Sequence, residues 1–532
     1  MSSATQGKKE LTESFVPTDR EVYPVVDLFA GPGGLGEGFA SLEGSDGAAV
    51  FKSVVSIEQD EHAFETLRLR HFLRAFGRSE FPDEYHFYLS GDISLRELYG
   101  LYPGEKEHAD RSALRISLGP ATHDSVRTLI KDRIKDRGRW ALVGGPPCQA
   151  YSLVGRSRMM RDPEFEKDVR HFLYKEYLRI IIDHAPPVFV MENVKGLLSA
   201  KVGGELVINR ILADLASPRA ALGGGQNGLA YKLYSLGHDQ EADVQSDPRV
   251  FLIRSEDYGV PQNRHRMFIV GVREDIDVAP GQLQPDEPPT VRQMIGDLPK
   301  IRSGLSRSAD SLEAWLREIR QLDLSMVRRK LNGYEYAPEL LDAISTSFDC
   351  DVPRLNRISA KYPSAPSRKH PVLQSVYDSG LSVLTGHEAR SHMASDLRRY
   401  AFAAWFANVT GRSPMLSDFP PALLPDHKNI ALGKQGKMFA DRFRVQLADA
   451  PSTTITSHIS KDGHYFIHYD PIQCRSLTVR EAARLQTFPD NYKFEGPRTS
   501  QYHQVGNAVP PYLAKQIAEI VEQVLDAVKE KS

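Results

Sequence analysis

The chain has 532 residues, of which 41% are hydrophobic and 26% charged, and a formal net charge of −2 at pH 7, which excludes a disordered chain, a fibrous repeat and a uniformly basic coat. No run of 18 or more apolar residues occurs and the polar start, MSSATQGKKELTESF, lacks the apolar segment of a signal peptide, so we expect a cytoplasmic protein that does not attach to a membrane. The three cysteines, Cys148, Cys350 and Cys474, are widely spaced and odd in number, which favours a reducing compartment and gives no metal site.

After a polar tail over residues 1–22, the first half of the chain alternates short β-rich runs with amphipathic stretches. The runs expected to form strands are residues 23–30, 52–60, 85–92, 140–147, 187–194 and 266–272. Residues 168–184 carry apolar side chains near helical spacing, and Pro186 and Pro187 end that helix before the next strand. The pattern predicts a large α/β domain over residues 23–300, in which residues 94–140 and 200–230 are variable loops or insertions.

A glycine-rich segment, GPGGLGEGF, follows the first expected strand. Gly31, Gly33 and Gly36 have the spacing at which backbone amides approach a nucleotide-type cofactor closely. Nicotinamide-dependent oxidoreductases share this spacing, and a tight structural turn would also explain it. Glu58, at the end of the second strand, can accept hydrogen bonds from ribose hydroxyls, which favours an adenosine-containing ligand. Asp92 follows the third expected strand and could bind an adenine amine, although a simple turn residue explains it equally well.

Cys148 lies in the segment LVGGPPCQAYS, directly after the fourth expected strand. Two prolines restrict the backbone before it, and ligands of α/β proteins bind beyond the carboxyl ends of the strands. A buried, inert cysteine is the commoner fate of this residue type, but a polar, proline-restricted loop is a poor place to bury one. The position therefore favours a nucleophile.

From about residue 274 the alternation fades into proline-rich and charged stretches, so we place a second domain at residues 301–474. Residues 361–450 contain 12 Lys and Arg against 7 Asp and Glu, a formal charge of +5, which leaves −7 for the rest of the chain. A phosphate-contacting surface and an ordinary solvated surface explain this charge equally well. The chain closes with an amphipathic helix within residues 502–532.

The segments GGPPCQAYS and DLFAGPGGLGEGF resemble the DNA cytosine-5 methyltransferase family, of the bacterial restriction-modification type. Four further segments agree in family order: MENVKG, QNRHRMFIVGV, RSLTVREAARLQTFPD and QVGNAVPP. The resemblance covers about residues 25–300 and 450–525. It implies a Rossmann-like S-adenosyl-L-methionine-dependent methyltransferase domain at residues 23–300, a smaller irregular target-recognition domain at residues 301–474, a supporting segment at residues 475–501 and a C-terminal helix returning to the catalytic domain.

The resemblance also implies roles for individual residues. Those expected to bind S-adenosyl-L-methionine are Phe29, Gly31, Gly33, Gly34, Leu35, Glu58, Gln59, Asp92, Ile93, Pro147, Asn507 and Val509. The expected catalytic residues are Cys148, Glu192, Arg264 and Arg266. The expected DNA contacts are Ser152, Arg390, Arg398, Lys434 and Arg442, although an amphipathic structural helix is the stronger reading of the stretch around Arg390 and Arg398.

The chemistry explains why such residues are needed. Carbon 5 of cytosine is too weak a nucleophile to attack a sulfonium methyl, and addition of the Cys148 thiolate to carbon 6 enriches it in electrons. An acid at ring nitrogen 3, the role that matches Glu192, absorbs the charge that would build there. The target atom is unreachable in stacked DNA, so the base must be flipped out. Water is the expected acceptor of the carbon 5 proton.

Three alternatives compete with this interpretation. A family member acting on transfer RNA would use the same catalytic residues, although the long recognition interval favours duplex DNA. A nicotinamide-dependent oxidoreductase would leave Cys148 and Glu192 unexplained. A catalytically silent homologue is disfavoured because both residues are present.

By the same resemblance we expect a monomeric, nucleoid-associated bacterial protein. Its partners are double-stranded DNA and a cognate restriction endonuclease encoded nearby.

Overall fold

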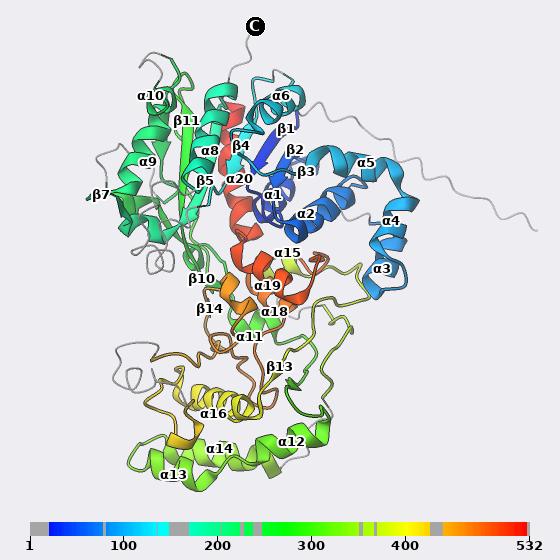
Figure 1. The fold of residues 1–532 in the computed structure, drawn as a ribbon, viewed down its shortest axis with the longest axis vertical. Coiled ribbons are helices and arrows are strands. Elements are labelled where there is room, and N and C mark those ends of the chain that lie inside the picture. Colours follow the sequence, from blue (N-terminus) through cyan, green and yellow to red (C-terminus); the bar gives the residue numbers. More distant parts are fainter. Residues whose placement is uncertain are drawn as a thin grey trace, which may run out of the picture.

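The computed structural model describes residues 21–77, 81–135, 137–147, 170–202, 204–223, 228–237, 247–349, 355–365, 370–425 and 440–528. Two units lie one above the other, a sheet with helices on both faces and a smaller, mainly helical unit (Figure 1). Among the described residues, no helix combines the length and the apolar character needed to cross a membrane.

A mixed sheet organises the larger unit. Its strand order is β3-β2-β1-β4-β5-β11-β8, with β9 paired to β11. The neighbours from β3 to β5 are parallel, whereas β11 runs antiparallel to both β5 and β8. The strand bounds are β1 Tyr23–Leu28, β2 Phe51–Glu58, β3 Ala113–Arg115, β4 Ala141–Gly144, β5 Val188–Val194, β8 Tyr231–Tyr234, β9 Leu252–Arg254 and β11 His265–Arg273. The α/β fold class is confirmed, as are five of the six expected strands.

Helices cover both faces of this sheet because its central strands bury side chains on both sides. The helices of the larger unit are α1 Gly34–Ala40, α2 Glu61–Arg74, α3 Asp83–Ser90, α4 Leu95–Leu101, α5 Pro103–Ser112, α6 His123–Ile134, α8 Arg170–His184, α9 Val207–Ala216, α10 Pro218–Ala221 and α20 Pro511–Asp526. Helix α8 connects parallel strands β4 and β5, as the sequence predicted.

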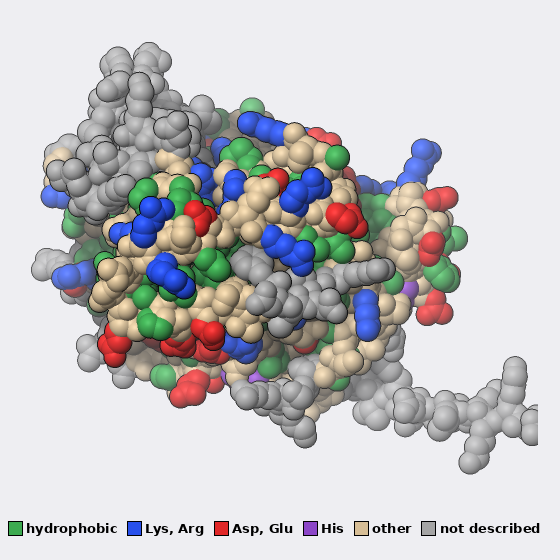
Figure 2. Space-filling view, turned by 90° about the horizontal axis from the view of Figure 1, so that it is seen from below, with side chains coloured by type: hydrophobic (Ala, Val, Ile, Leu, Met, Phe, Trp, Pro, Cys, Tyr) green, Lys and Arg blue, Asp and Glu red, His purple; other side chains and the backbone are tan. Residues whose placement is uncertain are grey.

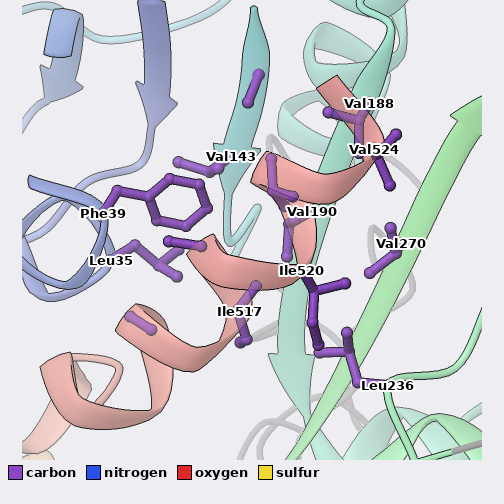
Figure 3. Packing of buried hydrophobic residues seen from close by; sticks show 14 of the residues in the cluster. Leu35, Phe39, Val143, Val188, Val190, Leu236, Val270, Ile517, Ile520 and Val524 are labelled. Carbon is purple, nitrogen blue, oxygen red and sulfur yellow. The ribbon is translucent and has the colours of Figure 1, made fainter. Parts of the chain in front are cut away.

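The closing helix α20 packs on the same face as α1. Leu35 and Phe39 of α1 and Ile517 and Ile520 of α20 belong to one cluster with the valines of β4, β5 and β11 (Figure 3). A Cβ atom on Gly38 would lie 2.3 Å from Cβ of Ala514, so only glycine allows the two helices to approach this closely. The two ends of the chain are thereby joined in one core.

Two sequence predictions about residues 85–140 are wrong. Residues 85–92 do not form a strand, because residues 83–90 form helix α3 and Gly91 ends it with a φ of +85°. The third strand is instead β3, which pairs in parallel with β2. Residues 94–140 are therefore not merely an insertion, since they carry β3 and helix α6, whose Val126 and Ile130 are buried against the sheet.

The smaller unit has its own apolar core around α16. Its helices are α12 Leu312–Arg320, α13 Leu324–Leu331, α14 Ala337–Asp349 and α16 Ala394–Thr410, and short strands β12 Gly304–Leu305 and β13 Ser391–His392 pair beside them. Trp315, Tyr400 and Phe406 are buried there. Seen from this end, Lys and Arg side chains are interspersed with Asp and Glu and with uncharged surface (Figure 2).

A third core joins the two units. It contains helices α11 Val291–Ile295, α15 Pro371–Val376, α18 Val479–Leu485 and α19 Arg498–Asn507. Three arginines of the 475–490 segment are almost wholly buried and have carboxylate partners in the same segment: Arg475 pairs with Glu481, and Arg480 and Arg484 pair with Asp490. The domain boundaries at residues 300, 474 and 501 remain predictions.

Candidate active site

The glycine loop follows β1 at the carboxyl edge of the sheet. Phe29, Gly31 and Gly33 have φ values of +60°, +58° and +100°, so the chain turns sharply here before α1 begins at Gly34. The backbone N–H of Gly31 donates to Oε2 of Glu58 over 2.8 Å. The second carboxylate oxygen of Glu58 accepts from the N–H groups of Gln59 and Asp60. The ends of β1 and β2 are thus joined through one carboxylate.

Tyr492 and Val509, from the C-terminal part of the chain, pack against the glycine loop. A Cβ atom on Gly34 would lie 2.3 Å from the carbonyl oxygen of Val509, which explains why glycine stands there. The Tyr492 hydroxyl donates to the Pro32 carbonyl over 2.5 Å. Asn507, in contrast, is exposed, and its amide contacts His503 at 3.1 Å. The juxtaposition of the glycine loop with residues 508–509 agrees with the family-based expectation.

These residues fit an adenosine-containing ligand. The Glu58 carboxylate is held by backbone donors at the end of β2, where ribose hydroxyls can reach it. A Cβ atom on Gly31 would meet no heavy atom within 4 Å, so there is open space over the loop. Gln59 and Ser117 extend the same edge, with 3.2 Å between the Gln59 side-chain oxygen and the Ser117 hydroxyl.

Asp92 and Ile93 do not follow a strand of the sheet, contrary to the sequence prediction. They follow α3, and the N–H of Asp92 donates to the carbonyl of Phe87. The residues that do follow the third strand are Ile116 and Ser117, which the sequence analysis missed. The alternation in ALRIS, just before the turn at Gly119 and Pro120, is the signal that could have revealed them.

Glu192 of β5 lies beside the loop that leaves β4. Strands β4 and β5 are paired, with Gly144 opposite Met191, so the loop beginning at Gly145 starts next to Glu192. A Cβ atom on Gly145 would lie 2.9 Å from Oε2 of Glu192. The Asn193 side chain donates to the Pro146 carbonyl over 3.1 Å and so fixes the start of the loop that follows β4. Asn193 was not singled out from the sequence.

Three expected site residues, Cys148, Ser152 and Lys434, lie outside the described residues. Pro147 is described, and it is half-buried at the point where the loop passes on to Cys148.

Arg266 faces the Glu192 carboxylate. The Nε atom of Arg266 lies 3.1 Å from Oε1 of Glu192, and each side chain is about one-seventh exposed. Burial raises the pKa of Glu192 above its ordinary value, although the charges of Arg266 and Arg264 oppose the rise. A carboxyl group with a raised pKa is better suited to donate a proton than an ordinary glutamate.

Arg264 lies in the interior, apart from this pair. Its side chain is 0% exposed, and it donates to the carbonyl oxygens of Ile455, Gly506 and Ala508 over 2.8–3.2 Å. It thereby ties the start of β11 to two chain segments about 190 and 240 residues away. This geometry gives Arg264 a positioning role and leaves Arg266 as the arginine at the carboxylate.

Replacing Arg264 by Met should destabilise the protein strongly. The Ile455 and Gly506 carbonyls would lose a buried donor, and an unsatisfied buried group costs about 1–3 kcal/mol, so we expect a loss of about 2–5 kcal/mol in the free energy of unfolding. Urea unfolding followed by circular dichroism measures this loss in the free energy of unfolding. Arg254→Met, at a side chain that is 60% exposed, is the matched control and should stay within about 0.5 kcal/mol of wild type. An unchanged stability in Arg264→Met would contradict the positioning role.

A cavity of about 470 Å³ opens beside Asn263, between the strand-end site and the smaller unit. Short strands β10 Gln262–Asn263 and β14 Ser452–Thr453 pair at its edge. Its walls carry polar side chains and one arginine: Asn263, Asp441, Arg444, Thr453, Thr454, Thr456, His458 and Tyr465, with Phe466. This lining suits hydrogen bonding to a polar ligand.

The described DNA-contact candidates all have partners within the protein. Arg390 donates to the Ile459 carbonyl over 2.6 Å and its guanidinium lies 4.5 Å from the centre of the Tyr502 ring. Arg398 contacts Gln321 at 3.4 Å, and Arg442 lies 4.0 Å from Asp462. Buried Arg399 beside them donates to the Leu423 carbonyl, so α16 acts as a structural helix. DNA contact by Arg390, Arg398 and Arg442 remains a prediction.

Comparison with known proteins shows what this chain is similar to over most of its length. The family model described as C-5 cytosine-specific DNA methylase matches residues 120–523. Type II methyltransferase M.Bpa9945I of Bacillus paralicheniformis is 33% identical over 527 residues, which cover 94% of this chain and 99% of that protein. DNA (cytosine-5-)-methyltransferase M.ApeKI of Aeropyrum pernix is 27% identical over 420 residues, covering 73% and 82%. A prophage-encoded E. coli protein, solved as a candidate DNA modification methyltransferase, shares the fold with a TM-score of 0.51 at 20% identity, covering 95% and 99%.

Proposed function

Because the chain belongs to the C-5 cytosine-specific DNA methylase family, and so is a DNA (cytosine-5-)-methyltransferase that uses S-adenosyl-L-methionine, we propose that Cys148, Glu192 and Arg266 form its reaction centre. The observation that carries this proposal is the 3.1 Å contact between Arg266 and Glu192, next to the loop that continues into Cys148. Bisulfite sequencing of DNA from cells that express the protein tests the activity and reveals its target sequence.

In the proposed reaction, the Cys148 thiolate adds to carbon 6 of a cytosine flipped out of the helix. Glu192 gives a proton to ring nitrogen 3 as the bond forms, so that the electron pair builds at carbon 5 rather than on the ring nitrogen. Arg266 orients the Glu192 carboxyl and can donate to oxygen 2 of the base. S-adenosyl-L-methionine supplies an electrophilic methyl group. Loss of the carbon 5 proton to water then expels the thiolate, and the proton on ring nitrogen 3 returns to the Glu192 carboxylate, which restores the neutral aromatic ring.

We propose that the methyl donor is held by the loop from Phe29 to Leu35, by Glu58 and Gln59, and by Pro147 and Val509. The fixed Glu58 carboxylate and the open space over Gly31 support this placement. Ser117 takes the place that the sequence assigned to Asp92, because it follows the third strand. Asn507, exposed at the end of α19, is kept as a contact to the amino-acid part of the ligand.

Residues 301–474 are proposed to select the DNA sequence. They contain a separate apolar core, and the polar cavity beside Asn263 lies where this unit meets the catalytic strand ends. Arg444 and His458 in that cavity can donate to base edges or phosphates. The substrate is proposed to be duplex DNA.

Exchanging residues 301–474 for the matching interval of M.Bpa9945I should transfer that protein's methylation site. We expect the chimaera to keep S-adenosyl-L-methionine binding, because the glycine loop and Glu58 lie outside the exchanged interval. Bisulfite sequencing after expression reads the site. The reciprocal exchange is the control, and an unchanged site in both chimaeras would refute the assignment.

We also propose that the enzyme is the modification partner of a type II restriction endonuclease and acts as a monomer in the bacterial cytoplasm. Its resemblance to type II methyltransferases over nearly its whole length supports the first point. Expression of an endonuclease encoded beside it, with and without this protein, tests protection directly. Sedimentation velocity of the free protein tests the monomer.

A further inference from the structure

A basic cavity lies at the opposite end of the sheet from the reaction centre. It has a volume of about 520 Å³ and opens at the start of β1 and β2, against α5 and the end of α6. Its lining residues are Val22, Pro24, Lys52, Ser53, Val54, Gly104, Glu107, His108, Arg111, Ser112, Arg133, Lys135 and Arg137. Since β1 has six residues, the cavity and the glycine loop are separated by about 20 Å along the strand.

The charges of this cavity are strongly unbalanced. Among its described lining residues, five are Lys or Arg and one, Glu107, is acidic. Glu107 lies 3.6 Å from Arg111, and both side chains are more than 60% exposed, so this contact is weak. The four remaining cations make no ion pair within the described part of the chain; they are Lys52, Arg133, Lys135 and Arg137.

The side chains of Arg133 and His108 show how the positive charges act inside the cavity. Arg133 is half-buried, and its Nε atom is buried with no acceptor among the described residues, although an unmade hydrogen bond of a buried donor is costly. The pKa of His108 is lowered by its burial and by the positive charges of Lys52, Arg111 and Arg133. Lys52 of β2, Arg111 of α5 and Arg133 of α6 therefore all act on the His108 side chain.

We propose that this cavity is a second anion-binding site, built for phosphate groups and separate from the reaction centre. Guanidinium groups present planar pairs of donors that match phosphate oxygens, and Lys52 adds a point charge. The phosphate could belong to a free compound such as a nucleotide, or to a DNA segment other than the one in the active site. The edge of the sheet that carries the cavity faces away from the smaller unit (Figure 1).

Isothermal titration with inorganic pyrophosphate at low ionic strength tests the site. We expect one equivalent to bind wild type, and Lys52→Ala/Arg133→Ala to bind at least about tenfold more weakly because two charges on one anion are lost. Arg127→Ala is the matched control, because Arg127 lies on the same helix α6 but outside the cavity, and it should bind as wild type. Lys135→Ala/Arg137→Ala provides a second test if the first variant unfolds at a lower temperature.

An independent readout is the pKa of His108, followed by NMR. A bound anion should raise it, because the anion offsets the cations that now lower it. Repeating the pyrophosphate calorimetry in the presence of an A·T duplex without cytosine separates the two sources of phosphate. If the duplex excludes pyrophosphate, the site binds DNA phosphate. If pyrophosphate binding is unchanged, the site binds a free phosphate compound. Absence of pyrophosphate binding, or binding that survives in both double variants, would overturn the proposal.

Discussion

Replacing Cys148 by Ser is expected to abolish both methylation and covalent trapping on DNA that carries 5-fluorocytosine at the target. Fluorine cannot leave carbon 5 as a proton does, so the wild-type enzyme should stay attached through the Cys148–carbon 6 bond after methyl transfer. A serine hydroxyl is far less ionised near neutral pH than a thiol with a pKa of about 8.5, so it should not add. Denaturing gel electrophoresis of labelled DNA measures the adduct.

The control for this experiment is binding. Cys148→Ser should bind S-adenosyl-L-methionine and DNA as tightly as wild type, because the glycine loop, Glu58 and the smaller unit are untouched. A second control, Cys474→Ser, removes a thiol that is buried in the smaller unit and should leave trapping intact. Methylation of carbon 5 by Cys148→Ser would show that the proposed nucleophile is wrong.

Replacing Glu192 by Gln should slow methylation by roughly a hundredfold or more, the loss usual for a general acid. Gln is nearly isosteric and can still hydrogen-bond to the base, but it cannot give a proton to ring nitrogen 3. DNA binding and cofactor binding should change little. Single-turnover rates measured with saturating DNA separate the chemical step from binding. Glu256→Gln is a suitable control, because Glu256 is a similarly buried glutamate that contacts His265 rather than the site.

The pH dependence supplies a second test of the same assignment. Burial raises the pKa of Glu192, so its protonated form persists to higher pH than that of an ordinary glutamate near 4.3. Methylation should therefore decline as pH rises through the raised pKa of Glu192, and increase as pH rises through the pKa of Cys148. In Glu192→Gln the decline should disappear while the increase remains. A wild-type rate and an unaltered pH profile in Glu192→Gln would contradict the role of this residue.

The sequence alone determined those parts of the site that lie within one continuous segment. The strand and glycine loop at residues 23–36, the acidic end of β2 at Glu58 and the alternation around β4 and β5 are local patterns, and the structure has each of them where it was expected. Glu192 could be placed for the same reason, since a parallel β4–β5 pair brings the ends of adjacent strands together.

The sequence could not separate the roles of Arg264 and Arg266. The two residues are two positions apart, and their partners distinguish them. The fold brings the carbonyls of Ile455 and Gly506 to Arg264, and the Glu192 carboxylate to Arg266. No local pattern encodes contacts between residues about 200 positions apart. The intramolecular partners of Arg390 and Arg398 also come from distant segments, so the sequence did not reveal these contacts.

Only the tertiary structure decided which segment is the third strand. Residues 85–92 are rich in aromatic and apolar side chains typical of a strand, yet they form α3, whose Tyr85 and Leu89 pack into a helical cluster with Phe72 of α2. Strand β3 has three residues, so the short alternation in ALRIS is a weaker signal than the aromatic run at residues 85–92, and the strand forms by pairing with the edge of β2. Long, periodic segments carry their own structure, whereas short strands and buried polar contacts take theirs from neighbours that only folding brings close.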